Sequence, residues 1–212
     1  MKSAPSTLRR QERSEATRER LLRSAEVIFA RDGFEAARLE EIAAEAGYTR
    51  GAFYANFESK EDLFFALLEG EISSRIAAVE KLVQEFRDPA AKLRALREFF
   101  LKLCEDRRWS LLALEFKLFA VRHPEVRARL AALNRRLAGP RIRVLRQVMP
   151  GHKTPVSATA IAMSLSAATS SLALEHMLDR NAMPESTMKH ILATYFDGLI
   201  GAELCGAATR RS

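Results

Sequence analysis

Residues 49–60 hold the side chains whose types and spacing best suit chemistry, and that chemistry is hydrogen bonding to DNA bases. Arg50 carries parallel N–H donors that match O6 and N7 of guanine, the commonest base-specific contact in the major groove. Gly51 permits close approach of the backbone, and the methyl group of Ala52 can touch the methyl group of thymine. These three residues follow one another at an expected helix start. We therefore expect this helix end to read base edges.

Other side chains around this helix end carry donors for phosphate oxygens, which position a protein on DNA without reading its sequence. Thr49, Tyr54 and Asn56 belong to this group, although Tyr54 equally fits an ordinary half-buried aromatic residue. Lys60 and Arg38 each stand at a helix start, where a positive charge opposes the helix dipole and a bound phosphate would compensate for it. For Arg38 the alternative is a side chain that extends into solvent.

The elements that must position these residues form a helix-turn-helix. Apolar residues at helical spacing predict helices over residues 39–46 and 50–56, with a tight glycine-containing turn at residues 47–49. Thr49, the last residue of that turn, can cap the second helix. A helix over residues 14–31, ended at Gly33, completes a three-helix head. In this motif the second helix enters the major groove.

The composition favours a helical DNA-binding protein over an enzyme. With nine Gly and seven Pro in 212 residues, long helices are more consistent than a turn-rich β fold. A net charge of +7 and a pI near 9.8 favour polyanionic partners, nucleic acid first. The nucleotide-binding patterns GxGxxG and GxxxxGK(S/T) and the metal-binding pattern HExxH do not occur. We therefore expect no enzymatic activity, no cofactor and no metal site.

Neither a signal peptide nor a membrane-spanning segment is expected. The N-terminus has no apolar core before the charged run at Arg9, and the most apolar window, residues 155–174, is rich in Ser, Thr and Ala. Cys104 and Cys205 have neither a metal nor a redox spacing, which is typical of a reduced protein. The sequence therefore predicts a cytoplasmic protein without membrane association.

The expected architecture is all-α, in three parts. Residues 1–13 are polar and basic and are expected to form a flexible arm, with contact to the DNA backbone and free solvation as open alternatives. Residues 14–60 form the helix-turn-helix head. Residues 61–212 form a larger helical domain for effector binding and dimerisation, in which residues 61–86 are a connecting helix too long to belong to the head alone.

The last two predicted helices, residues 156–178 and 186–204, have apolar faces that could form a four-helix interface between two identical chains. Ordinary burial in the core of one domain is the alternative. A helix-turn-helix needs two half-sites for useful affinity, which favours a homodimer.

Residues 25–68 resemble the DNA-binding region of TetR-family repressors. The matching pieces, in fixed order and spacing, are Ala25…Ile28-Phe29-Ala30…Gly33-Phe34, Glu41-Ile42-Ala43…Ala46-Gly47-Tyr48-Thr49-Arg50-Gly51 and Phe53-Tyr54…Phe57…Ser59-Lys60…Leu63-Phe64. The resemblance implies a homodimer that binds a palindromic double-stranded operator and that a small molecule, bound in the C-terminal domain, releases from DNA. By position, the family's DNA contacts fall on Thr49, Arg50, Gly51, Ala52, Tyr54, Asn56 and Lys60.

Three positions depart from the family pattern. Ala37-Arg38 stands where Ser or Thr is usual before the second helix, Asn56 stands where His is usual, and Ala55 is smaller than the usual residue. The family's phosphate contacts at these places therefore do not carry over directly.

The effector pocket is expected in the C-terminal domain, among apolar residues with a few polar groups. The candidate lining is Phe99, Leu103, Trp109, Ala113, Phe116, Phe119 and His176. The same residues equally suit a plain helical core. With the family resemblance they predict a transcriptional repressor that a small hydrophobic effector releases from its operator. The alternative is a DNA-binding regulator controlled by a protein partner.

Overall fold

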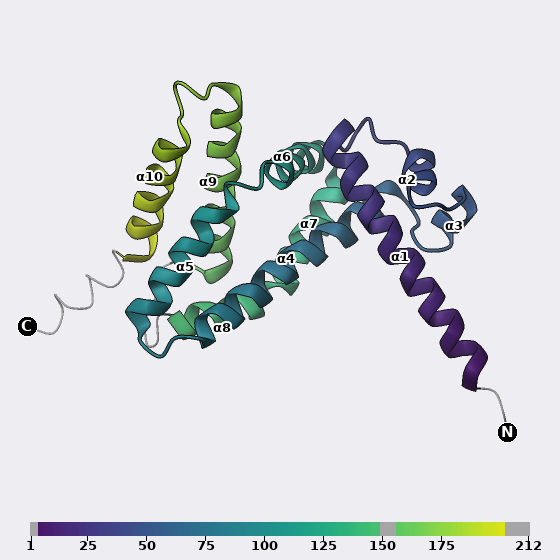
Figure 1. Ribbon diagram of the computed structural model, residues 1–212, viewed down its shortest axis with the longest axis horizontal. Coiled ribbons are helices and arrows are strands. Elements are labelled where there is room, and N and C mark those ends of the chain that lie inside the picture. The colour runs from purple at the N-terminus through teal and green to yellow at the C-terminus, as the bar shows by residue number, and fades with distance from the viewer. Residues whose placement is uncertain (1–3, 149–155, 202–212) are drawn as a thin grey trace, which may run out of the picture. The chain divides into compact units, whose positions relative to one another are not determined.

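The computed structural model describes residues 4–148 and 156–201, and every regular element in these ranges is a helix, which confirms the all-α prediction (Figure 1). The chain forms two compact units, Met1–Glu71 and Ile72–Ser212. The first holds α1 (Ala4–Asp32), α2 (Leu39–Glu45), α3 (Arg50–Tyr54) and the start of α4 (Lys60–Gln84). The second holds the rest of α4, then α5 (Pro89–Leu103), α6 (Arg107–Arg122), α7 (Pro124–Arg136), α8 (Ala138–Val148), α9 (Ala158–Leu178), α10 (Glu185–Phe196) and a π-helical turn (Asp197–Gly201).

Three phenylalanine rings form the centre of the first unit. The ring centroid of Phe29 in α1 lies 5.6 Å from that of Phe34 in the following loop and 5.4 Å from that of Phe64 in α4. Phe34 and Phe64 meet edge to face at 5.1 Å. Ile42 of α2 and Phe53 of α3 are fully buried in the same unit. The two short helices are therefore held on a base formed by α1 and α4.

Two glycines with positive φ make the turns that the sequence predicted. Gly33 (φ 80°) follows the end of α1, and Gly47 (φ 76°) follows α2. After α2, the amide of Tyr48 donates to the carbonyl of Ala43 (2.8 Å) and the amide of Gly47 donates to the carbonyl of Ala44 (2.9 Å). This is the Schellman arrangement, whose left-handed residue favours glycine. It turns the chain sharply from α2 toward α3.

The start of α1 corrects the prediction of a flexible arm over residues 1–13. The helix begins at Ala4 rather than near residue 14, and residues 1–3 lie outside the described residues. Pro5 falls in the first helical turn, where its missing N–H breaks no hydrogen bond. Once a helix has started, each further residue adds one bond, so a polar segment without an internal breaker can extend it. Ser14 donates to Oδ1 of Asn56 (3.4 Å), which joins α1 to the end of α3.

The first residue of α4 holds the loop between α1 and α2. Lys60 donates from Nζ to the carbonyl oxygens of Glu35 (2.8 Å) and Ala37 (3.1 Å). The same ammonium lies 5.0 Å from the centre of the Phe34 ring. Burial lowers the pKa of Lys60. These bonds fix the path by which the chain enters α2.

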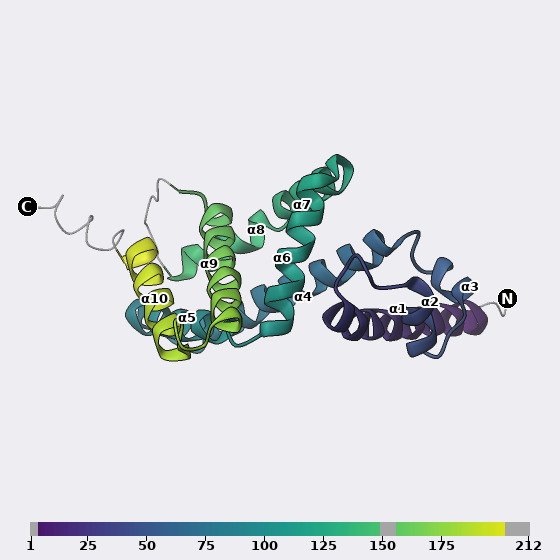
Figure 2. The same cartoon turned by 90° about the horizontal axis from the view of Figure 1, so that it is seen from above.

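The second unit is built around α9. This helix packs against α6, α8, α10 and α5, and α6 also packs against α7 (Figure 2). One apolar cluster joins Phe100 of α5, Leu192 and Phe196 of α10, and Val83 at the end of α4. The rings of Phe100 and Phe196 stack at 5.7 Å. Within the described ranges, no helix has both the length and the apolar character needed to cross a membrane.

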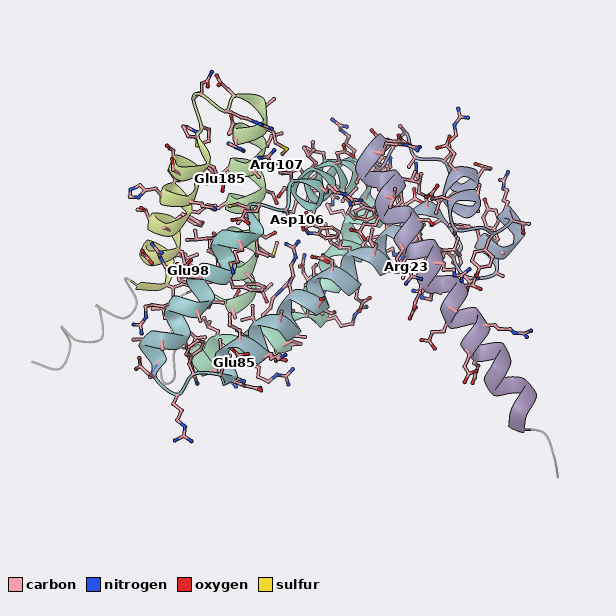
Figure 3. All side chains as sticks on the ribbon, viewed as in Figure 1. Arg23, Glu85, Glu98, Asp106, Arg107 and Glu185 are labelled. Carbon is pink, nitrogen blue, oxygen red and sulfur yellow. The ribbon has the colours of Figure 1, made fainter. Side chains whose placement is uncertain are left out.

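Polar contacts gather where α5 leads into α6. Asp106 caps α6 by accepting from the amide of Trp109 (3.0 Å) and also pairs with Arg75 of α4 (3.0 Å). Lys189 of α10 bridges Glu105 (2.7 Å) and Glu185 (2.8 Å), and these contacts raise the pKa of Lys189. Figure 3 labels Asp106 and Arg107 at this passage and Glu185 at the start of α10. The passage therefore connects α4, α6 and α10.

Replacing Lys60 by Met should remove the two hydrogen bonds to the loop carbonyls and keep most of the aliphatic stem. Because the ammonium is only partly buried, we expect a loss of about 1–2 kcal/mol in the free energy of unfolding. Urea unfolding would measure this loss, and amide hydrogen exchange over residues 33–38 should become faster. Lys81→Met, at an exposed position of the same helix, is the control. Equal stability and exchange in the two variants would contradict the prediction.

Candidate nucleic-acid interface

Arg50 is the first residue of α3, and its side chain is exposed. Its Nη1 lies 2.9 Å from Oε1 of Glu40 in α2, and its Nη2 donates to the hydroxyl of Tyr54 (3.3 Å). The guanidinium also lies 5.5 Å from the centre of the Tyr54 ring. These contacts, with Tyr54 first and Glu40 after it, raise the pKa of Arg50. The charged side chain is thus held at the start of α3, and some of its N–H donors remain free of these two partners.

The three neighbours of Arg50 occupy the predicted places at the helix start. Thr49 is the N-cap of α3, and its Oγ1 accepts from the amide of Ala52 (3.3 Å), which confirms the predicted cap. Gly51 is exposed and Ala52 is half-buried. A Cβ built on Gly51 would meet only Oγ1 of Thr49, at 3.7 Å, which is ordinary contact. Nothing in the described head therefore requires glycine at this position.

The remaining candidates for phosphate contact differ in how many of their side-chain donors already bond other groups of the first unit. Tyr54 is 45% exposed. Arg38 is exposed before α2, and its side chain makes no cap and has no hydrogen-bond or ion-pair partner among the residues that the structure describes. Asn56 donates from Nδ2 to the carbonyl of Ala52 (2.8 Å), so one of its N–H groups closes the end of α3. Lys60 uses two donors on the loop before α2.

Three residues that the sequence did not single out belong to this site. Glu40 pairs with Arg50, Ser14 donates to Asn56, and the guanidinium of Arg18 lies 4.3 Å from the centre of the Phe57 ring. The first contact joins α2 to α3, and the other two join α1 to the turn after α3. No local pattern could identify them, because they depend on how α1, α2 and α3 cross.

The predicted effector-pocket residues fall into separate groups. Phe99 and Leu103 of α5 pack against the apolar cluster that contains Phe100. Four others lie on α6, with Ala113 and Phe116 buried and Trp109 and Phe119 half-buried. The residues of α6 do not belong to that cluster within the described part of the chain.

His176 of α9 is buried, and both of its ring nitrogens have partners inside the protein. Nδ1 lies 2.7 Å from the carbonyl oxygen of Met183, and Nε2 lies 3.1 Å from Nη2 of Arg107. A carbonyl can only accept and a guanidinium can only donate, so this pairing assigns the ring proton to Nδ1. His176 thus links α9 to the start of α6 and to the loop before α10.

Comparisons with known proteins agree with this arrangement. The family model for bacterial regulatory proteins of the tetR family matches residues 21–67, and the model for the C-terminal domain of BetI-type transcriptional repressors matches residues 89–201. The transcriptional repressor NicS of Pseudomonas putida is 30% identical over 153 residues, which are 66% of this chain and 65% of NicS. The chain thus spans less than two thirds of the length of NicS and of the next curated relatives.

Two solved structures have the same fold. A transcriptional regulator from Saccharomonospora viridis in complex with choline has a TM-score of 0.64 and 20% identity, over 85% of this chain and 95% of that one. FadR from Bacillus subtilis in complex with stearoyl-CoA has a TM-score of 0.62 and 16% identity, over 84% and 96%. The C-terminal family model alone covers more than half of the chain. This protein therefore belongs to the TetR family of DNA-binding transcriptional regulators, which are not enzymes, and has a BetI-type C-terminal domain.

Proposed function

We propose that this chain is a repressor that binds a palindromic operator as a homodimer, with α3 of each protomer in a major groove. The observation that carries the proposal is the exposed Arg50 at the first position of α3, whose free donors suit O6 and N7 of guanine. Gly51 and Ala52 follow it on the same helix start. The full set of proposed DNA contacts is Arg38, Thr49, Arg50, Gly51, Ala52, Tyr54, Asn56 and Lys60.

The phosphate contacts in this set have unequal freedom to form. Arg38 and Tyr54 are exposed and can turn toward a phosphate without breaking a described hydrogen bond to the backbone. Lys60 has three donors and uses two of them, so one N–H remains. Asn56 likewise keeps one N–H of its amide. Such contacts position the head, while the base contacts of Arg50 supply sequence preference.

Dimerisation through α9 and α10 is part of this proposal. The two helices lie side by side in both views (Figures 1 and 2). Large apolar side chains are exposed on both: Met163 and Leu178 on α9, and Ile191 and Tyr195 on α10. Burying them against a second copy would give the four-helix interface expected over residues 156–178 and 186–204, of which residues 202–204 lie outside the described residues. Two heads could then reach two half-sites.

The effector is proposed to bind in the second unit along α6. Trp109 and Phe119 are half-buried there beside buried Phe116, so they can supply apolar contact. Lys117, on the same helix face as Ala113, is half-buried and has no ion-pair partner among the described residues. Burial lowers the pKa of Lys117, and an anionic group nearby would offset that cost. An effector with an apolar body and an anionic group, such as an acyl-CoA, fits this set better than a cation such as choline.

Gly51→Ala should weaken operator binding and leave folding intact. The added methyl group has room within the head, so stability should stay the same or rise by up to about 1 kcal/mol. The methyl would, however, hold the backbone away from the bases, and we expect operator affinity to fall about tenfold. Fluorescence anisotropy with operator DNA would measure the affinity. Gly70→Ala, another exposed helical glycine with open space around it, is the matched control. Identical DNA affinity in the two variants would count against α3 as the reading helix.

The double variant Met163→Glu, Ile191→Glu should dissociate the dimer, because two carboxylates per chain would have to lose water at the interface. Sedimentation velocity should show a dimer for the wild type and a monomer for this variant, with operator affinity falling in parallel. Leu118→Glu, at an exposed position of α6, is the control for added charge. A variant that stays dimeric would place the interface elsewhere.

Stearoyl-CoA should change the fluorescence of Trp109, the single tryptophan of the chain, and should weaken operator binding. Choline should do neither. Lys117→Met should lower the affinity for stearoyl-CoA about tenfold if one ion pair is lost in a partly buried site, whereas Lys102→Met, at an exposed position of α5, should not. No response to either compound, with operator binding intact, would favour the alternative in which a protein partner controls the regulator.

A further inference from the structure

We propose that Glu40 is a specificity-determining residue, which positions Arg50 for guanine and keeps it off the DNA backbone. The inference rests on the proposed role of Arg50 in reading bases. Glu40 is the second residue of α2, and Arg50 is the first residue of α3. The pair therefore joins the two helices of the helix-turn-helix on their exposed side.

The geometry leaves Arg50 able to use both partners and a base at the same time. A guanidinium has five N–H donors, one on Nε and two on each terminal nitrogen. Glu40 takes one donor of Nη1 (2.9 Å) and the Tyr54 hydroxyl takes one donor of Nη2 (3.3 Å). Three donors remain, which is more than the two that guanine O6 and N7 require. Glu40 can thus stay bound while Arg50 contacts a base.

The charge of Glu40 changes which DNA groups Arg50 prefers. An unpaired arginine gains from any phosphate, because each phosphate contact releases counterions whatever the sequence. With a carboxylate 2.9 Å away, the local charge is close to neutral and that gain becomes smaller. Hydrogen bonds from Arg50 to guanine depend on donor geometry, so the nearby carboxylate weakens them less than it weakens the attraction to phosphate. The pair therefore lowers binding to random DNA more than binding to a site with guanine.

Stability of the fold does not explain the pair. The side chains of Arg50 and Glu40 are 62% and 56% exposed, and ion pairs at such positions contribute little to folding. The neighbouring Glu41 provides a contrast, since it pairs with Arg31 at the end of α1 (3.3 Å) and has no described contact with Arg50. Glu40 and Glu41 thus have the same charge on the same short helix and different partners.

The test compares the full-length wild type with Glu40→Gln, Glu41→Gln and Arg50→Ala. Each protein would first select sequences from a random DNA pool. Affinities would then be measured across a salt series for the selected operator, for the operator with the Arg50-dependent guanine changed to adenine, and for a random duplex. Thermal unfolding would check that all variants fold equally well. Glu40→Asp tests whether a carboxylate of shorter reach restores the preference.

We expect Glu40→Gln to reduce the preference for guanine over adenine about fivefold, the lower end of what one bidentate arginine pair supplies. It should also bind random DNA more tightly, with a salt slope steeper by about one phosphate contact. Glu41→Gln should bind DNA slightly more tightly and keep the preference for guanine. Glu40→Asp should recover part of the preference that Glu40→Gln loses.

If Glu40→Gln keeps the guanine preference as Glu41→Gln does, the inference is wrong although the DNA-binding function stands. An equal gain in random-duplex affinity for both glutamine variants, without loss of preference, leads to the same conclusion. If the wild type enriches no sequence, or enriches one that does not depend on Arg50, the proposed function itself fails.

Discussion

The packing of Phe29, Phe34 and Phe64 is the interaction on which the head depends. It joins α1, the loop after α1 and α4 through rings 5.1–5.6 Å apart. Without this base, α2 and α3, with seven and five residues, would be far too short to persist as helices in water. The exposed residues at the start of α3 are therefore positioned by a buried aromatic cluster that other elements of the head supply.

Within the head, most of the polar residues proposed to contact DNA already have hydrogen-bond or ion-pair partners. Arg50 has Glu40 and Tyr54, Asn56 has Ser14 and Ala52, and Lys60 has two loop carbonyls. These contacts restrict the side chains before DNA arrives, so less conformational entropy is lost on binding. They also mean that each residue reaches DNA only with the donors that remain.

In the second unit, the apolar cluster and the aromatic residues proposed to bind an effector lie on different helices. Its apolar cluster lies among α5, α8, α9, α10 and the end of α4, whereas Trp109, Phe116 and Phe119 lie on α6. His176, which by residue type resembles a ligand contact, instead has both nitrogens satisfied within the protein. Lys117, which lacks an ion pair among the described residues, is a half-buried group on α6 with which an anionic effector could pair.

The sequence alone determined the elements of this protein, because those depend on local properties. Apolar spacing, the Thr49 cap and the two turn glycines were enough to predict an all-helical chain with a helix-turn-helix whose second helix starts at Arg50. The start of α1 was misplaced, since a polar segment can extend a helix without any apolar pattern. Tertiary structure alone decided that Arg50 pairs with Glu40, that Lys60 bonds the loop carbonyls before α2 and that His176 meets Arg107, because contacts between separate elements depend on packing geometry that residue spacing along one helix does not contain.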